Sequence, residues 1–278
     1  EQSKYVGKKV VFYDVEELIK LADLLFEKSK DEADHKKAFR LYSIADSKGS
    51  LYAKACLGYC YCLGKGVSED KEKGLTLIHV SANAGNAKGQ NVMGLCYCKG
   101  LGVVQSYEEA VKWYRKSAEQ GYARAQYNLG RCYEDGSGTP LCYEEAVKWY
   151  SMSAKQGFVN AQCRLGSLYF MGLGVDLSME KGVKWYCKAA KQGDVDAQFF
   201  IAVCYESGIG GAKSCEEAIK WYRKAAEQGS SAAQRNLAYC YEKGKGIAKN
   251  IDEAVAWYRK AANQGDNSAM ESLERLTK

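Results

Sequence analysis

The sequence predicts an all-α fold, a right-handed α/α solenoid of about seven 36-residue helix-turn-helix repeats with a terminal capping helix. Two observations predict it. Gly58, Gly94, Gly130 and Gly166 are spaced 36 residues apart, and a tyrosine and a tryptophan recur with the same period without a gap. The 278 residues include 28 glycines and one proline, a composition typical of many helices that end at glycine.

Each repeat is predicted to contain two short helices. From Ala125 to Tyr133 apolar residues recur at i, i+4 and i+8, which indicates a first helix, here called helix A, that ends at Gly136. A column of cap residues that starts at Asp34 then precedes a second helix, helix B. In the segments that begin at Ser106 and Ser214, a glutamate follows three residues later, and this spacing predicts capping boxes.

The period also predicts where each repeat begins and ends. Because a pair of helices this short cannot bury its own apolar stripe, the pairs must stack on their neighbours. The predicted segments are an N-terminal arm or cap at 1–14, a divergent first repeat at 15–50, repeats at 51–86, 87–122, 123–158, 159–194, 195–230 and 231–266, and a C-terminal capping helix at 267–278.

The repeated motif resembles a known family. The pattern A-x-x-x-L-G-x-x-Y-x-x-G-x-G, followed by E-A-x-x-W-Y-x-K-A-A-x-Q-G, is similar to that of the Sel-1-like repeats, relatives of the tetratricopeptide repeats, over roughly residues 15 to 277. The first repeat departs from the pattern because it lacks the G-x-G loop and the tryptophan. The resemblance implies a non-catalytic adaptor or scaffold that binds a peptide or protein partner along a concave surface of helices A.

Columns that vary between repeats predict the partner-binding surface. On helix A the columns of Tyr52, Ala55, Tyr59 and Cys62 change, and their spacing of i, i+3, i+7 and i+10 places them on one helical face, here called the helix A face. We expect this face not to pack between repeats, and to bind a carboxylate or an extended acidic peptide through arginine, asparagine and aromatic side chains. The candidate residues are Tyr52, Tyr59, Lys88, Asn91, Leu95, Arg124, Tyr127, Asn128, Arg131, Glu134, Asn160, Arg164, Phe170, Asp196, Phe199, Phe200, Val203, Arg235 and Tyr239.

The twelve cysteines are predicted to be reduced. Five of them occupy the packing column of Leu168, which treats cysteine as a small buried hydrophobe. Equivalent positions on neighbouring helices are about 8–10 Å apart, beyond the reach of a disulfide. We therefore expect a cytoplasmic protein, or one in the secretory pathway or secreted if a targeting segment has been removed. We also expect Cys62 and Cys98 to react faster than the packed Cys96 and Cys132.

No catalytic, metal or cofactor site is predicted. The chain has no C-x-x-C, and His35 and His79, expected to be exposed on helix B, lack partners at the spacing of a zinc site or catalytic triad. The formal net charge is +6, and no apolar stretch approaches the ~20 residues of a membrane span. The alternatives are an RNA-binding helical repeat, which the modest charge disfavours, and a regulator or virulence-type effector that uses the same protein-binding surface.

Overall fold

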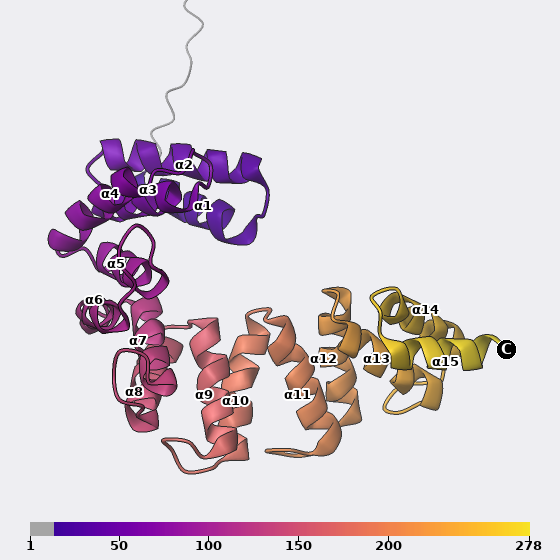
Figure 1. The fold of residues 1–278 in the computed structure, drawn as a ribbon. Coiled ribbons are helices and arrows are strands. Elements are labelled where there is room, and N and C mark those ends of the chain that lie inside the picture. The colour runs from indigo at the N-terminus through magenta and orange to yellow at the C-terminus, as the bar shows by residue number, and fades with distance from the viewer. Residues whose placement is uncertain (1–13) are drawn as a thin grey trace, which may run out of the picture. The chain divides into compact units, whose positions relative to one another are not determined.

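The computed structural model describes residues 14–278 and confirms the predicted fold class. Within this range the chain forms fifteen helices and no strand (Figure 1). These residues fall into two compact units, of which the first contains the described residues up to Ala125 with 137–139, and the second contains 126–136 with 140–278. The predicted arm, 1–14, lies outside the described residues except for Asp14, which immediately precedes the first helix.

The helices are short, and most contain 13 residues. They are α1 (Val15–Lys28), α2 (Glu32–Ser47), α3 (Leu51–Leu63), α4 (Lys71–Asn83), α5 (Ala87–Lys99), α6 (Tyr107–Glu119), α7 (Ala123–Asp135), α8 (Tyr143–Lys155), α9 (Val159–Met171), α10 (Met179–Lys191), α11 (Val195–Ser207), α12 (Cys215–Glu227), α13 (Ser231–Lys243), α14 (Ile251–Ala262) and α15 (Asn267–Thr277). From α3 to α14 the odd-numbered helices are helices A and the even-numbered ones are helices B. In the second unit each helix from α9 to α14 packs against the next one along the chain (Figure 1).

The starts of helices B show only half of the predicted capping box. The Ser106 hydroxyl accepts a hydrogen bond from the N–H of Glu109 at 3.2 Å, and Ser214 is a cap of the same kind. The reciprocal bond is absent at both serines, so the prediction of capping boxes is wrong at both. The Ser106 N–H donates instead to the carbonyl oxygen of Tyr97, and the Glu109 carboxylate accepts a hydrogen bond from Lys112. The cap residue thus also ties the start of α6 to α5.

The first repeat departs from the register of the others. Helix α2 begins directly after Asp31, whose side chain accepts a hydrogen bond from a backbone N–H at 3.0 Å, so the prediction that Asp34 caps this helix is wrong. His35 is buried rather than exposed, because its ring packs 5.6 Å from that of Phe26 on α1. His79 on α4 is exposed, as predicted.

The two glycines of each G-x-G loop have different roles. Gly172 adopts the left-handed conformation with φ of 66° and ends α9. Gly174 has φ of 67°, and a Cβ atom at this position would lie 2.3 Å from the carbonyl carbon of Tyr143, at the start of α8 in the preceding repeat. Only glycine meets both requirements. The loop is therefore an inter-repeat contact as well as a connector.

Buried leucines, tyrosines and small residues form the core between helices. Leu165 and Leu168 on α9 and Tyr150 on α8 are at most 1% exposed and belong to one cluster. A Cβ atom at Gly166 would lie 2.7 Å from the ring of Tyr186, so α9 and α10 approach closely at this point. Burying one leucine of this kind contributes about 1.5–3 kcal/mol. The constant columns of the sequence are thus the packed ones.

A ladder of paired glutamines crosses the helices in each unit. In the sixth repeat, Gln198 on α11 is 4% exposed, donates to the carbonyl oxygen of Ala190 on α10 at 3.1 Å, and accepts from Gln228 at the end of α12 at 2.8 Å. One side chain thus links three helices and two repeats. The same Gln to Gln bond recurs at a separation of 30 residues in four other repeats, from Gln120 to Gln90, Gln156 to Gln126, Gln192 to Gln162 and Gln264 to Gln234.

The ladder predicts that Gln198→Leu destabilises the protein. The substitution removes both hydrogen bonds of a buried amide, so we expect the free energy of unfolding to fall by about 1–3 kcal/mol in urea denaturation. Gln105→Leu is the matched control, because Gln105 is exposed and both of its side-chain hydrogen bonds lie at the surface. It should cost less than half as much. Equal losses in the two variants would show that burial of the glutamine is not what stabilises the stack.

A buried carboxylate joins the capping helix α15 to the last repeat. Glu242 on α13 is 4% exposed, and both of its oxygens lie 2.9 Å from the guanidinium of Arg275 on α15. Lys243 and the Tyr258 hydroxyl, at 2.6 and 3.0 Å, complete its contacts. The hydrogen bonds from Arg275 outweigh the effect of burial and lower the pKa of Glu242 to about 2.

This shift predicts an acid-sensitive C-terminal cap. The folded state holds the pKa of Glu242 below the usual value of about 4.3, so the carboxylate stabilises the fold above that pH and loses its effect as the pH falls toward 2. Glu242→Gln should therefore lower the free energy of unfolding at pH 7, and the difference from the wild type should shrink steadily below pH 4. A difference that stays constant down to pH 2 would contradict the assignment.

Candidate functional site

The second unit carries a groove on the helix A face. Its volume is about 390 Å³, and it is lined by residues of α7, α9, α10 and α11 and of the turn before α11. Five predicted site residues line this groove. They are Tyr127, Asn160, Arg164, Asp196 and Phe200.

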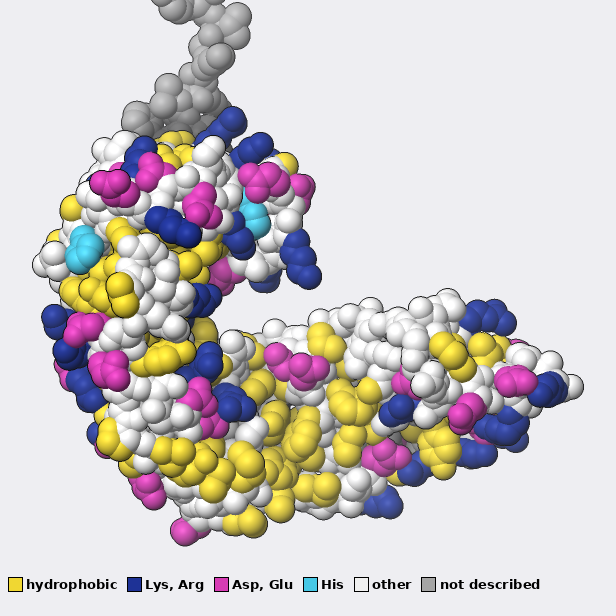
Figure 2. All heavy atoms as spheres, viewed as in Figure 1, with side chains coloured by type: hydrophobic (Ala, Val, Ile, Leu, Met, Phe, Trp, Pro, Cys, Tyr) yellow, Lys and Arg dark blue, Asp and Glu magenta, His cyan; other side chains and the backbone are white. Residues whose placement is uncertain are grey.

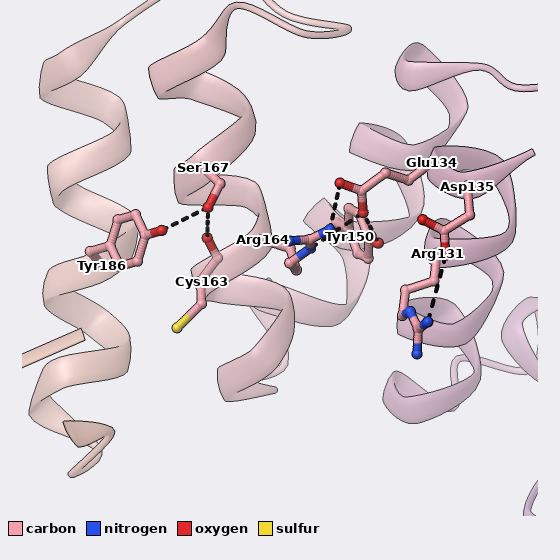
Figure 3. Close-up of polar contacts among 8 residues, drawn as sticks. All are labelled: Arg131, Glu134, Asp135, Tyr150, Cys163, Arg164, Ser167 and Tyr186. Carbon is pink, nitrogen blue, oxygen red and sulfur yellow. Dashed lines mark hydrogen bonds and ion pairs between the residues drawn. The ribbon is translucent and has the colours of Figure 1, made fainter. Parts of the chain in front are cut away.

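Arg164 in the lining of this groove belongs to a charged cluster that spans two repeats. Figure 3 shows Arg164 on α9 and Glu134 on α7 pointing toward one another, with two contacts, Nη2 to Oε1 at 2.8 Å and Nε to Oε2 at 3.3 Å. The Tyr150 hydroxyl donates to the same carboxylate at 2.6 Å. Burial and this bond raise the pKa of Tyr150. Arg164 is therefore held in one orientation with part of its guanidinium exposed.

Another part of the groove lining is aromatic. Phe200 on α11 lies 4.3 Å from the ring of Tyr186 on α10 and 5.1 Å from that of Phe170 on α9. The hydroxyls of Ser167 and Tyr186 are 2.7 Å apart and share a hydrogen bond (Figure 3). The groove thus combines a fixed cation, a flat apolar surface and two hydroxyls, with the carboxylates of Asp194 and Asp196 at its α11 side.

The helix A face packs between repeats more than the sequence predicts. We expected Phe170, Phe199 and Arg164 to leave neighbouring repeats untouched, yet Phe170 packs on the next repeat's Phe200 and Arg164 binds the previous repeat's Glu134. Phe199 lies 5.9 Å from the ring of Tyr222 and joins the core. The prediction is wrong for Phe170 and Arg164, because these long side chains reach the adjoining repeat, whereas the contact of Phe199 with Tyr222 lies within its own repeat.

The first unit contains a smaller and more enclosed cavity. Its volume is about 70 Å³, and it lies between α1, α2, α3, α5 and the first residues of α7. Five further candidates line it, namely Tyr59, Lys88, Asn91, Leu95 and Arg124.

Hydrogen bonds from tyrosines organise one side of this cavity. Asp23 on α1 accepts from the hydroxyls of Tyr42 and Tyr52, both at 2.6 Å, and the Lys88 ammonium donates to the Tyr52 hydroxyl at 3.3 Å. Burial raises the pKa of the adjoining Cys56 thiol to about 11, so this thiol stays protonated at neutral pH. Tyr52, a candidate residue, therefore supports the cavity without lining it.

The remaining candidates lie outside both features. Arg131 pairs with Asp135 at 3.5 Å, apart from the Arg164 cluster (Figure 3), and Arg235 pairs with Asp266 at 3.1 Å. Tyr239 is 44% exposed. Asn128 and Val203 are half-buried and line neither the groove nor the cavity.

Sequence reasoning missed residues in both features. In the cavity the clearest are Asp23 and Phe26 of the first repeat, and in the groove the clearest is Tyr186 on a helix B. The column alignment contains a signal for the first two, because Asp23 falls in the column of Arg131 and Phe26 in that of Glu134. No such signal marks Tyr186, which belongs to a constant packing column.

The cysteines are free thiols at all twelve positions, which lie within the described residues. Cys62 is only 1% exposed, so the prediction that it is an accessible thiol is wrong. It lies at the packed end of α3, where its sulfur covers Gly74 of α4. Cys98 is half-buried. Among residues 14–278, no group of three or more His, Cys, Asp and Glu side chains is placed to hold a metal ion, and no helix is long and apolar enough to cross a membrane.

Seven consecutive segments match the sequence model of the Sel1 repeat, at residues 18–50, 52–86, 87–122, 123–158, 159–194, 195–230 and 231–266. The chain belongs to the Sel1 repeat family. The family resemblance read from the motif is confirmed. Sel1 repeat proteins generally mediate protein-protein interactions, and their fold is typically non-catalytic.

Solved structures of bacterial proteins share the Sel1 repeat fold. A protective antigen of uropathogenic Escherichia coli is 32% identical with a TM-score of 0.71, over 94% of this chain and 64% of its own length. A Sel1 repeat protein from Oxalobacter formigenes is 39% identical with a TM-score of 0.67, over 72% of this chain and 83% of its own. An immunity protein of Pseudomonas aeruginosa, 20% identical with a TM-score of 0.54 over 77% of this chain and 81% of its own, shares the fold alone. A comparison with curated proteins gave no match.

Proposed function

We propose that this Sel1 repeat protein is a non-catalytic scaffold that binds a peptide or protein partner along the helix A face. The groove of the second unit is the observation that carries the proposal. Its lining residues come from consecutive repeats, so an extended chain lying across the helices would meet a new set of side chains at each repeat.

The chemistry of the groove fits a polypeptide. Arg164 offers an oriented guanidinium to a carboxylate or a backbone carbonyl, and Phe200 with Tyr186 offers a flat surface to an apolar side chain. Asn160 is exposed and its side-chain amide makes no hydrogen bond to the described residues, so this amide can pair with a peptide backbone. Residues that mix aromatic anchors with arginine are typical of the energetic centres of protein interfaces.

The distribution of charge favours a protein over RNA. On the visible face in Figure 2, basic and acidic side chains are interspersed, and the groove contains two aspartates beside its one arginine. An RNA backbone would meet repulsion from these carboxylates and would need a denser basic surface than a net charge of +6 provides.

The proposal predicts that peptides selected from a random display library against the whole chain bind in the groove. The test variant is Asn160→Ala with Asp196→Ala, because both side chains are exposed and lie in the groove. Each desolvated contact contributes about 1–3 kcal/mol, so we expect affinity measured by calorimetry to fall at least about tenfold, with an unchanged circular dichroism spectrum.

The matched control is Lys148→Ala on α8, whose ammonium pairs with Glu145 of its own helix at 3.1 Å. Such an exposed pair contributes only about 0.2–0.5 kcal/mol to its helix, and the control should bind the peptides normally. The proposal would be contradicted if the control lost binding and the groove variant kept it. It would also be contradicted if no peptide were selected while a single-stranded RNA bound with a steep dependence on salt.

A further inference from the structure

The cavity of the first unit contains the Lys88 ammonium, a cation whose hydrogen-bond donors are only partly used. Among residues 14–278, the Lys88 ammonium makes one hydrogen bond, to the Tyr52 hydroxyl at 3.3 Å, and no carboxylate lies within ion-pair distance of it. The Tyr52 ring, 4.8 Å from the nitrogen, adds a cation-π contact. An ammonium carries three donors, so two of them have no protein acceptor.

A second donor and an apolar surface lie in the same cavity. The Tyr59 hydroxyl makes no hydrogen bond to any described residue, and its ring packs 6.2 Å from that of Phe26. Val92 and Leu95 complete an apolar side. The cavity thus offers a charged donor and a phenolic donor next to hydrocarbon.

The acidic groups that line the cavity are already engaged. Both oxygens of Asp23 accept hydrogen bonds from tyrosine hydroxyls, and the Glu27 carboxylate pairs with the Arg124 guanidinium. The free donors of the lining therefore need one more acceptor. That acceptor must be small, because the cavity offers about 70 Å³ and one water molecule alone needs about 10–15 Å³ of such space. A dianion such as phosphate would face stronger repulsion from Asp23 and Glu27 than a monoanion would, and a neutral carbonyl would be attracted to the ammonium less strongly than a carboxylate.

We propose that this cavity binds a single carboxylate on a short apolar stem, with one oxygen on Lys88 and the other on Tyr59. The carboxylate would be the chain end or an acidic side chain of the polypeptide partner. Only that source rests on the proposed function, because the cavity and its donors belong to the first unit alone.

The test uses three small probes and the whole chain in two-dimensional NMR. N-acetylleucine presents a chain-end carboxylate, N-acetylglutamic acid α-amide presents only a side-chain carboxylate, and N-acetylleucinamide presents none. We expect saturable shifts of the amides of residues 88–95 with at least one acid, and binding at least about tenfold weaker for the neutral amide. Binding of the first acid alone would assign the site to chain ends, and binding of the second alone to acidic side chains.

Lys88→Met should weaken binding of the acids at least about tenfold, while Lys112→Met, which removes an exposed lysine paired with Glu109, should not change it. If Lys88→Met does not fold, Tyr59→Phe decides, because it removes only the free hydroxyl and should weaken binding several-fold. Equal affinity for leucine acid and amide, or wild-type affinity in the folded Lys88 or Tyr59 variant, would overturn the proposal. So would the absence of saturable shifts at residues 88–95 with both acids.

The failure of this proposal and that of the proposed function can be told apart. The Asn160→Ala, Asp196→Ala protein should bind the acids normally, because its changes lie in the second unit. If the wild-type protein binds the acids but no selected peptide binds in the groove, the scaffold proposal is contradicted and the carboxylate-site proposal is not.

Discussion

The structure depends on one constraint: a 36-residue helix pair can bury its apolar stripe only against the next pair. Three recurring contacts meet this constraint inside each unit. The second loop glycine, as at Gly174, lies on the backbone of the preceding helix B, and a constant leucine fills the space between helices. A buried glutamine such as Gln198 connects two helices B through the helix A between them. Each contact repeats because the period repeats.

The same constraint explains where binding sites can form. Positions that carry these contacts cannot vary, so chemistry for a partner is confined to the remaining columns of helices A. These columns are not inert, because long side chains such as Arg164 and Phe170 also reach the adjoining repeat. Contacts between repeats hold such side chains in place before a partner arrives, which reduces the entropy that binding must overcome. Stability and recognition therefore overlap on this face.

Much of the fold could be predicted from the sequence, because period, caps and glycines are local or periodic signals. The groove and the cavity were only partly predictable. Column position identifies Lys88 and Arg164 as variable, but the pattern cannot show that Arg164 reaches Glu134 or that Lys88 lacks a carboxylate. The glutamine column is as constant as that of the leucines, so the pattern marks it as packed without showing what it binds. The first repeat was misjudged at Asp34, because its cap lies three residues earlier, outside the common register.

Deletion of one complete repeat tests the central claim most directly, because equivalent positions should be interchangeable between neighbours. Removing residues 195–230 joins Asp194 to Ser231 and would bring Gln234 to the carbonyl of Ala190 in place of that of Ala226. We predict a folded protein with unchanged helical circular dichroism per residue and cooperative unfolding. The deletion of residues 195–224 is out of phase with the 36-residue period, and this variant should lose helical signal and cooperative unfolding. Loss of helicity in the in-phase variant, or equal behaviour of the two variants, would contradict the account.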